Sequence, residues 1–376
     1  MNKKLLLLLC IVGLFTACSN YADINTESKP ISGKHYTLQE LEPMTYKFKV
    51  VFHFLQNNKS ELSAVHTTHL QTIIDAINNF YVGNTNETNT KVVFELADNA
   101  PQGKTLSEKG ITRYNITEDS ISYNALINEK PGDKFYDMGW DRANYINIYV
   151  YTTKEKNIGG VSTLPKMPKS VAKDGDIVAS GNEYTSYNVS VTLQKALLGL
   201  WLKAEKKYPN ISPAKVIPSD SNPVNVLAHE LGHYLGLYHV FHTKEADNDY
   251  CEDTKEYDRN EYMKRVDAAQ PTIDAAIKAN DAKAYYAAID PLFMRTPMNG
   301  GSSFKSVNIM DYYYTDANKF TADQVKRIRR HLYYSTTIPG PKVYLGTGNG
   351  FSVNPPENLY KRSSLETETA QAPATE

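Results

Sequence analysis

Cysteine and net charge are both scarce in this chain of 376 residues. Of its 3 cysteines only Cys251 lies beyond the first 18 residues, so a small fold held together by disulfides is excluded. The stability of a chain of this length must come from its hydrophobic core. Lys and Arg total 41, and Asp and Glu total 42. Because the charge is balanced and no basic stripe interleaved with aromatic residues occurs, we exclude nucleic acid as a partner.

The apolar run at the N-terminus is too short for a comfortable membrane span. A basic start, an apolar stretch from Leu5 to Phe15 and small residues before Cys18 predict a secretory signal over residues 1–17. Residues 14–18, Leu-Phe-Thr-Ala-Cys, resemble a bacterial lipobox, although Phe15 stands where leucine is usual. We therefore expect lipidation of Cys18 and anchoring in the bacterial cell envelope, at the outer membrane, facing periplasm or exterior. An ordinary signal peptide with an incidental cysteine is the alternative.

Hydrophobic periodicity divides the rest of the chain into three parts. Residues 18–45 are polar without clear periodicity, which predicts a tether or short pro-segment, and residues 346–376 are expected to form a disordered tail. Residues 46–345 carry the patterns of a folded domain. Strands are expected at 48–55, 92–97, 111–114 and 145–151, and helices at 63–80, 193–204 and 257–289. This order predicts an α+β fold in which helices pack on a twisted mixed sheet.

The most informative segment is residues 229–239, which read His-Glu-Leu-Gly-His-Tyr-Leu-Gly-Leu-Tyr-His. Asn222 and Pro223 are suited to begin a helix through this segment. On such a helix His229 and His233 are four residues apart and therefore share one face, where a single metal ion can bind both imidazoles. Glu230 projects beside them, which suits a residue that acts on water at the metal rather than a ligand.

A third ligand requires the chain to turn. A helix that continued would carry His239 away, but Gly236 can adopt left-handed backbone angles and end the helix. We therefore expect a site of three histidines with a fourth position open to water, which is the arrangement of catalytic zinc. A lone pair of histidines with glutamate occurs by chance in many chains, whereas the full five-residue pattern is expected by chance in roughly one chain in 10⁵.

A second group of residues follows about 70 positions later. Residues 308–312 read Asn-Ile-Met-Asp-Tyr, and Thr321 and Gln324 have the spacing of a capping box for a further helix. After the histidine segment, this pattern resembles the Met-turn of metzincin zinc peptidases, in which a methionine forms an apolar floor beneath the metal. Packing of Met310 and Tyr312 in an ordinary core is the alternative.

Acidic residues cluster in a loop around Cys251. Calcium binds clustered carboxylate oxygens, so a calcium site is one prediction for this loop. A solvated acidic loop is the favoured alternative, because the spacing lacks the regularity of a known calcium loop. The residues concerned are Asp247, Asp249, Glu252 and Asp253.

The two motifs together with residues 249–254, Asp-Tyr-Cys-Glu-Asp-Thr, resemble the pappalysin family of metzincins. The resemblance spans about residues 48–333 and is specific at the motifs. It implies a metzincin-like domain with a five-stranded sheet, an upper subdomain over residues 46–236 and a mostly helical or irregular lower subdomain over residues 237–345. Two features depart from the family: Cys251 has no downstream cysteine to pair with, and residues 190–222 and 255–305 look like insertions.

The resemblance implies a zinc-dependent endopeptidase that acts on proteins or peptides. It implies that His229, His233 and His239 are the zinc ligands, Glu230 is the general base, and Tyr312 helps to hold the tetrahedral intermediate above Met310. The segment after Met310 is a candidate specificity pocket, in which a buried Asp316 would favour basic side chains. The four pocket candidates are Tyr313, Tyr314, Thr315 and Asp316.

Two rival interpretations stay open at this point. A lipid-anchored binding or adhesion protein on an inactive metzincin domain would not need both Glu230 and Tyr312. A gluzincin peptidase would take a glutamate from a later helix in place of His239. We expect a monomer, and substrate is expected to align as an added strand near residues 160–164.

Overall fold

The computed structural model describes residues 35–57, 61–129, 131–179, 190–243 and 248–345. The expected signal segment, Cys18 and the expected tail lie outside these ranges. Nothing in the described residues therefore tests the lipid anchor. No helix of the described residues is long and apolar enough to cross a bilayer.

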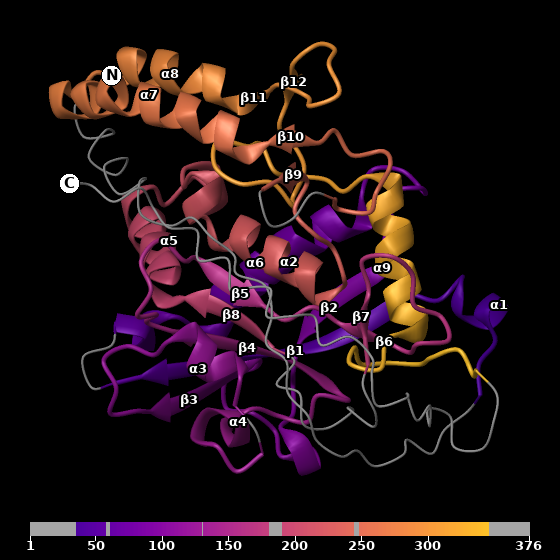
Figure 1. Ribbon diagram of the computed structural model, residues 1–376. Coiled ribbons are helices and arrows are strands. Elements are labelled where there is room, and N and C mark those ends of the chain that lie inside the picture. The colour runs from indigo at the N-terminus through magenta and orange to yellow at the C-terminus, as the bar shows by residue number, and fades with distance from the viewer. Residues whose placement is uncertain (1–34, 58–60, 130, 180–189, 244–247, 346–376) are drawn as a thin grey trace.

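A mixed sheet forms the centre of the fold (Figure 1). The strand order is β2-β1-β4-β8-β5, with β3 paired to β1, and every pair is parallel except β5 with β8. The predicted α+β class with a mixed sheet is therefore confirmed. The bounds are β1 (Tyr46–Gln56), β2 (Val92–Leu96), β3 (Ile111–Asn115), β4 (Tyr145–Tyr151), β5 (Gly160–Ser162) and β8 (Val191–Gln194).

The sheet has six strands, one more than expected, because two strands share one edge of β1. Strand β4 pairs with the middle of β1 and occupies one edge. On the other edge, β2 pairs with residues 46–50 of β1 and β3 pairs with residues 52–56. Strands β2 and β3 thus lie end to end, and together they take one position in the sheet.

Helices cover both faces of the sheet. Successive side chains of β1 point to opposite faces, and apolar side chains on both faces are buried. Phe48, Val50 and Phe52 face the larger core, which they share with α2 (Thr67–Val82), α5 (Lys195–Lys207) and α6 (Pro223–Tyr234). Leu55 and the β4 residues Tyr149 and Tyr151 face the smaller core, against α3 (Tyr123–Ile127) and α4 (Lys134–Met138). Because both faces of β1 and β4 are covered, these strands provide a rigid base beneath α6.

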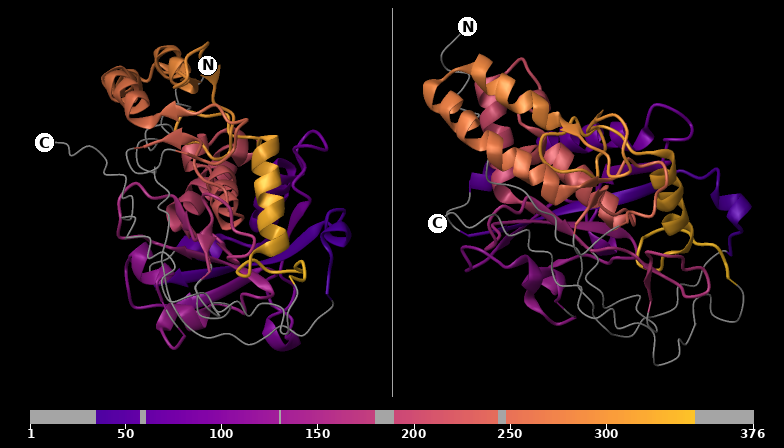
Figure 2. Two further views of the ribbon diagram at one scale, coloured as in Figure 1. Left: turned by 45° about the vertical axis from the view of Figure 1, so that its right-hand side comes forward. Right: turned by 45° about the horizontal axis from the view of Figure 1, so that its top comes forward.

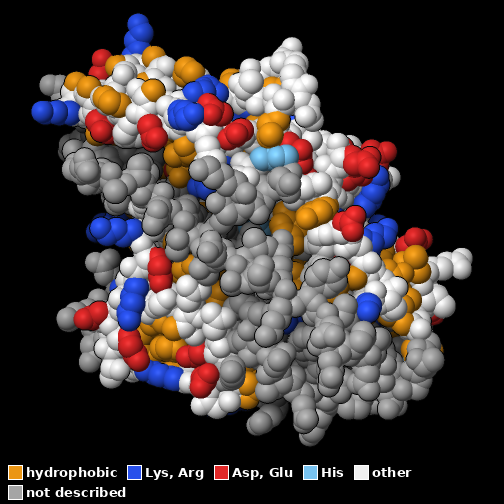
Figure 3. All heavy atoms as spheres, in the orientation of Figure 1, with side chains coloured by type: hydrophobic (Ala, Val, Ile, Leu, Met, Phe, Trp, Pro, Cys, Tyr) orange, Lys and Arg blue, Asp and Glu red, His pale blue; other side chains and the backbone are white. Residues whose placement is uncertain are grey.

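The C-terminal half is built from helices and short ladders. The expected helix at 257–289 is two helices, α7 (Arg259–Ala279) and α8 (Ala282–Ile289), because Asn280 adopts left-handed angles and Asp281 caps the second. This hairpin has its own small core and projects from the upper end of the molecule (Figure 2). Acidic and basic side chains are interspersed on the face shown in Figure 3.

Helix α9 (Ala322–Tyr334) begins at Thr321 with the predicted capping box. Short ladders join β6 (Lys166–Met167) to β7 (Ile177–Val178), β9 (Phe241–His242) to β10 (Tyr257–Asp258), and β11 (Met294–Arg295) to β12 (Phe304–Lys305). The 3-10 helices are η2 (Glu61–Ala64), η3 (Pro101–Gly103), η4 (Pro213–Lys215), η5 (Ser219–Ser221) and η6 (Asp290–Phe293).

The end of the expected tether is part of the folded domain. Helix α1 (Leu38–Leu41) buries Leu41, and Tyr36 forms a bridge with Val343. Arg329 on α9 donates hydrogen bonds to the carbonyl oxygens of Leu41 and Glu42 at 3.0 and 2.9 Å. The end of the segment expected as a tether therefore packs on the folded domain, and its polar composition alone did not reveal these contacts.

Candidate metal centre

Helix α6 brings two histidines and a glutamate to the centre of the molecule. The side chain of Asn222 accepts a hydrogen bond from the backbone N–H of Val224 at 3.0 Å, and Pro223 occupies the first turn, as predicted. His229 and His233 lie one turn apart on this helix. The helix packs against α2 and the sheet, so its ligands rest on the rigid part of the fold.

The chain reverses at Gly236 after the helix ends. Gly236 has a φ of +99°, and the His331 ring occupies the space that a side chain would need, with its nearest atoms 2.6 Å from the position of a Cβ. Only glycine combines this conformation with this close approach. The reversal returns His239 to α6, as the sequence predicted.

The three imidazoles converge on one point. The Nε2 atom of His233 lies 3.1 Å from the Nε2 atoms of both His229 and His239. Nitrogen atoms that share a tetrahedral zinc ion at bonds of about 2.0–2.1 Å lie about 3.3 Å apart, so this spacing fits zinc. Among the described residues these histidines form the one group suited to hold a metal. A histidine therefore stands where a gluzincin would use a later glutamate.

Hydrogen bonds orient two of the three rings. The Nδ1 atom of His229 donates to the carbonyl of Ile309 at 2.7 Å, and that of His233 donates to the carbonyl of Leu237 at 2.8 Å. Each Nε2 is thereby left with its lone pair directed to the metal position. Burial lowers the pKa of His233 to about 4 and lowers the pKa of His229 and His239 as well. Burial thereby favours the neutral form of all three rings, which is the form that binds a metal ion.

The Met-turn lies directly beneath the helix. Met310 is fully buried, and its sulfur fills the space in which a side chain at Gly232 would stand. The backbone N–H of Met310 donates to the side chain of Asn308 at 2.8 Å, and Asn308 is paired in turn with Gln324 of the α9 capping box. The two weak sequence signals, the Met-turn and the capping box, are therefore parts of one structure.

Tyr312 lies on the metal side of this turn. Its ring centroid is 5.1 Å from that of His229 and 4.6 Å from that of His239. The guanidinium of Arg259, at the start of α7, lies 5.3 Å from the Tyr312 ring. The structure thus brings the tyrosine and the ligands together, as predicted.

The segment that resembles an insertion, residues 255–305, supports the Met-turn. The buried Arg295 side chain lies 3.2 Å from Asp311 and donates to the carbonyl of Tyr312 at 2.9 Å. Tyr257 and Ser306 also donate hydrogen bonds to the Asp311 carboxylate. Sequence reasoning missed these residues, because an arginine in a segment without a motif gives no signal of its long-range partner.

Glu230 is buried against the edge strand β5. A Cβ at Gly160 would lie 2.7 Å from the Cγ atom of Glu230 and 2.8 Å from the carbonyl oxygen of Thr192. Glycine at this position therefore lets the β5 backbone approach the glutamate closely. Strand β5 is at the end of the sheet order, beside the metal centre, where an added strand was expected.

A pocket opens beside Glu230 and His229, and it contains only part of the expected specificity segment. Tyr313 and Thr315 line it, whereas Tyr314 and Asp316 do not. The condition for a basic preference set by Asp316, its burial, is not met, because Asp316 is exposed and forms an ion pair with Lys305. Besides Glu230 and Asp311, whose carboxylate is held by Arg295, the pocket is lined by the carboxyl group of Asp220. Sequence reasoning missed Asp220 because it lies in η5, before the motif helix.

The acidic loop forms no group of three metal-ligating side chains among the described residues. Asp249 accepts a hydrogen bond from the backbone N–H of Cys251, and Asp253 accepts one from the backbone N–H of Asp323. Asp247 lies outside the described residues, so calcium stays a prediction. Cys251 is a buried free thiol, as expected from its lack of a partner.

Three comparisons relate the chain to known proteins. Residues 214–333 match the peptidase M43 family model, described as pregnancy-associated plasma protein-A. A search of curated proteins finds no match. A promirolysin mutant of Tannerella forsythia is 18% identical over 77% of this chain and 81% of its own, with a TM-score of 0.48. Mature mirolysin of the same organism, in complex with a cleaved peptide, is 19% identical over 76% and 90%, with a TM-score of 0.46.

The family match covers the part of the chain that carries the histidines, the reversal and the Met-turn. This match and the three-histidine group together make the site similar to that of a metallopeptidase. The predicted resemblance is confirmed for residues 214–333, which are similar to peptidase family M43, the pappalysin metzincins.

Proposed function

We propose that this protein is a zinc-dependent endopeptidase that hydrolyses peptide bonds in proteins, with Glu230 as the general base. The observation that carries the proposal is the convergence of three Nε2 atoms over a buried methionine, with a glutamate on the same helix. Three imidazoles and one carboxylate are buried at the centre of the fold, which is costly in a protein that only binds its partner.

The mechanism follows from the positions of the chain's own residues. Zinc, when bound by His229, His233 and His239, would act as a Lewis acid and lower the pKa of water towards about 7. Glu230 accepts the proton of the attacking water and delivers it to the leaving amine. The Tyr312 hydroxyl donates a hydrogen bond to the oxyanion that develops on the scissile carbonyl.

Substrate binding uses the edge of the sheet. Strand β5 ends the sheet next to Glu230, so an extended peptide can add to it through main-chain hydrogen bonds. This places a scissile bond beside the general base, and one substrate side chain then enters the pocket lined by Tyr313, Thr315 and Asp220. We propose that Asp220 favours a basic side chain there, in place of the role first expected for Asp316.

The membrane tether and the calcium site are further parts of the proposal. Lipidation of Cys18 would hold the domain at the envelope of a bacterial cell through the polar residues that follow. A Cys18→Ala variant should move from the membrane fraction to the soluble fraction. Calcium at the acidic loop should raise the melting temperature of the purified chain, and no shift with added calcium would reject that site.

The test is cleavage of a proteome-derived peptide library by the purified chain. Cleavage should stop when a chelator removes the metal and return when zinc is added in slight excess. Sequencing the products then gives the preference of the pocket. Zinc binding without cleavage of any peptide would favour the rival interpretation, a binding protein on an inactive domain.

A further inference from the structure

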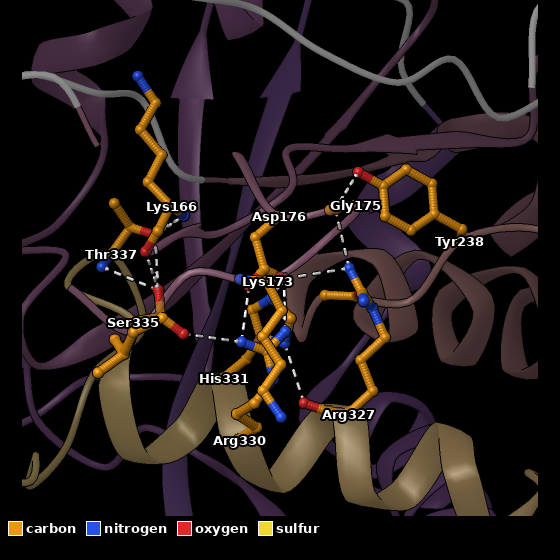
Figure 4. A network of polar contacts seen from close by, with 12 residues as sticks. Lys166, Lys173, Gly175, Asp176, Tyr238, Arg327, Arg330, His331, Ser335 and Thr337 are labelled. Carbon is orange, nitrogen blue, oxygen red and sulfur yellow. Dashed lines mark hydrogen bonds and ion pairs between the residues drawn. The ribbon is translucent and has the colours of Figure 1, made fainter. Parts of the chain in front are cut away.

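The loop between β6 and β7 carries a carboxylate that is completely enclosed (Figure 4). The Asp176 side chain has no exposed surface, and it receives three side chains from one face of α9. Arg330 binds both carboxylate oxygens at 2.6 Å, while Arg327 and His331 approach Oδ1 at 3.3 and 3.2 Å. Burial alone would raise the pKa of Asp176, but the bonds from His331 and Arg330 hold it below its usual value.

The same side chains also contact the reversal that delivers the third histidine. Arg327 donates from Nε to the carbonyl of Gly236 at 2.7 Å and from Nη2 to the carbonyl of Gly175 at 2.9 Å. The Tyr238 hydroxyl donates to that same Gly175 carbonyl at 2.7 Å. The His331 ring lies against the Cα atom of Gly236. Gly236 and Tyr238, which lie three residues and one residue before His239, are thus fixed to the Asp176 loop and to α9.

His239 depends on this support more than the other two ligands do. His229 and His233 lie on α6, and each donates a hydrogen bond to a backbone carbonyl. Among the described residues, no backbone carbonyl accepts a hydrogen bond from His239, whose ring is stacked on Phe241 with ring centroids 4.7 Å apart. Its position is therefore set by the backbone of the reversal, residues 236–238.

We propose that Asp176, Arg327 and His331 are positioning residues that hold the reversal at 236–238 and thereby place the zinc ligand His239. Asp176 fixes the two α9 side chains, which in turn fix Gly236. The inference rests on the proposed zinc site but concerns metal affinity, which is measured separately from peptide cleavage. Bonds that orient metal ligands typically contribute about 10- to 100-fold to metal affinity.

The experiment measures the zinc dissociation constant of the purified full chain by competition with a chromogenic chelator, at a temperature where each variant is folded. Arg327→Gln should weaken zinc binding by about 10- to 100-fold.

The matched control is Arg329→Gln. Arg329 also lies on α9 and donates to backbone carbonyls, but these belong to Leu41, Glu42, Met44 and Thr90, far from the reversal in sequence. The control should lower the melting temperature and leave zinc affinity within about twofold, since it touches no part of the metal centre.

Tyr238→Phe is a milder variant that removes a single hydroxyl and keeps the ring. It should weaken zinc binding by about 2- to 10-fold, the range for one hydrogen bond, and it keeps the proposal testable if Arg327→Gln does not fold. Equal loss of zinc affinity in Arg327→Gln and Arg329→Gln would overturn the inference, because the effect would then follow stability alone. Unchanged affinity in Tyr238→Phe and Arg327→Gln would also overturn it and leave the proposed function intact. Absence of zinc binding by the wild-type chain would reject both.

Discussion

The two halves of the metal centre are built in different ways. On one side, α6 places His229, Glu230 and His233 by the geometry of a single helix with its own cap. On the other side, His239, Met310 and Tyr312 come from loops whose positions depend on residues far away in sequence, such as Arg295 and Arg327. The residues of the helix side are therefore positioned by local helix geometry, whereas those of the loop side are positioned by long-range contacts.

The largest expected effect is on the helix side. Glu230→Gln keeps the size of the side chain and removes its ability to accept a proton, so turnover should fall by about 10²- to 10⁴-fold. Zinc content should remain that of the wild type, because Glu230 is beside the ligand group and not part of it. The measurement is kcat on a peptide taken from the library, with metal analysis of the same sample.

Glu205→Gln is the matched control for this change. Glu205 lies on α5 with an exposed side chain paired to His69, and its substitution should leave kcat unchanged. Wild-type turnover in Glu230→Gln would reject Glu230 as the general base and leave the helix side with only its two ligands.

The same contrast explains what could be predicted from the sequence. Strands β1 to β4, α6 with its Asn222 cap, and the turn at Gly236 follow from periods and from residues within a few positions of one another. Strands β5 and β8 were not expected from periodicity, and residues 193 and 194, expected in a helix, belong to β8. The Met-turn was recognised by resemblance, but its supports were not. Arg295 lies in a segment that looked like an insertion, and Asp176 lies in a loop with no motif, so only the folded structure shows which partners they meet.

The second prediction removes the buried ion pair that supports the loop side of the metal centre. Arg295 and Asp311 form an ion pair whose side chains are 0% and 2% exposed. Loss of one partner leaves an uncompensated buried charge, so Arg295→Met should lower the free energy of unfolding by about 3–5 kcal/mol. Denaturant titration of the purified chain measures this. Burial would lower the pKa of Arg295, but Asp311, Tyr257 and Tyr262 together raise this pKa above its usual value, so Arg295 stays charged at neutral and alkaline pH.

A surface ion pair on the same loop serves as the control. Asp316 is exposed and paired with Lys305, so Asp316→Asn should cost less than about 1 kcal/mol. Similar losses in Arg295→Met and Asp316→Asn would show that the Met-turn does not depend on the buried pair, and the contrast between the two halves would be weaker than proposed.

The third prediction concerns Gly160 on strand β5, which lies against Glu230 on the helix side. A Cβ at Gly160 would meet Glu230 at 2.7 Å and the rigid Thr192 carbonyl at 2.8 Å, so Gly160→Ala must displace the glutamate or the strand. A displacement of about 1 Å can reduce turnover by roughly 10²-fold. Zinc affinity should be unchanged. Gly199→Ala on α5 meets no atom within 4 Å and should keep full turnover.

The smallest expected effect concerns the substrate preference of the pocket. Residues of both halves of the metal centre line this pocket. Burial raises the pKa of Asp220 to about 7, and the hydrogen bond from Ser221 only partly offsets this. Asp220 is therefore protonated below about pH 7 and charged above it. A basic substrate side chain gains a partner only in the charged form, so preference for arginine over leucine in the pocket should rise by about 3- to 10-fold between pH 6 and pH 8.

The ratio of kcat/KM for two matched peptides measures this preference, because any effect of pH on the chemical step is common to both peptides and cancels. Asp220→Asn should make the ratio independent of pH and close to its value at pH 6. The free energy of unfolding changes with pH in the opposite direction to this preference, because it falls as the pH rises. Since the pKa of Asp220 is raised from 3.8 to about 7 in the folded chain, its contribution to stability is complete below pH 3.8 and is lost as the pH rises to 7. Asp220→Asn should therefore be more stable than the wild type at pH 8. An unchanged pH profile of the ratio in Asp220→Asn would show that the charge choosing the substrate lies elsewhere, on the loop side.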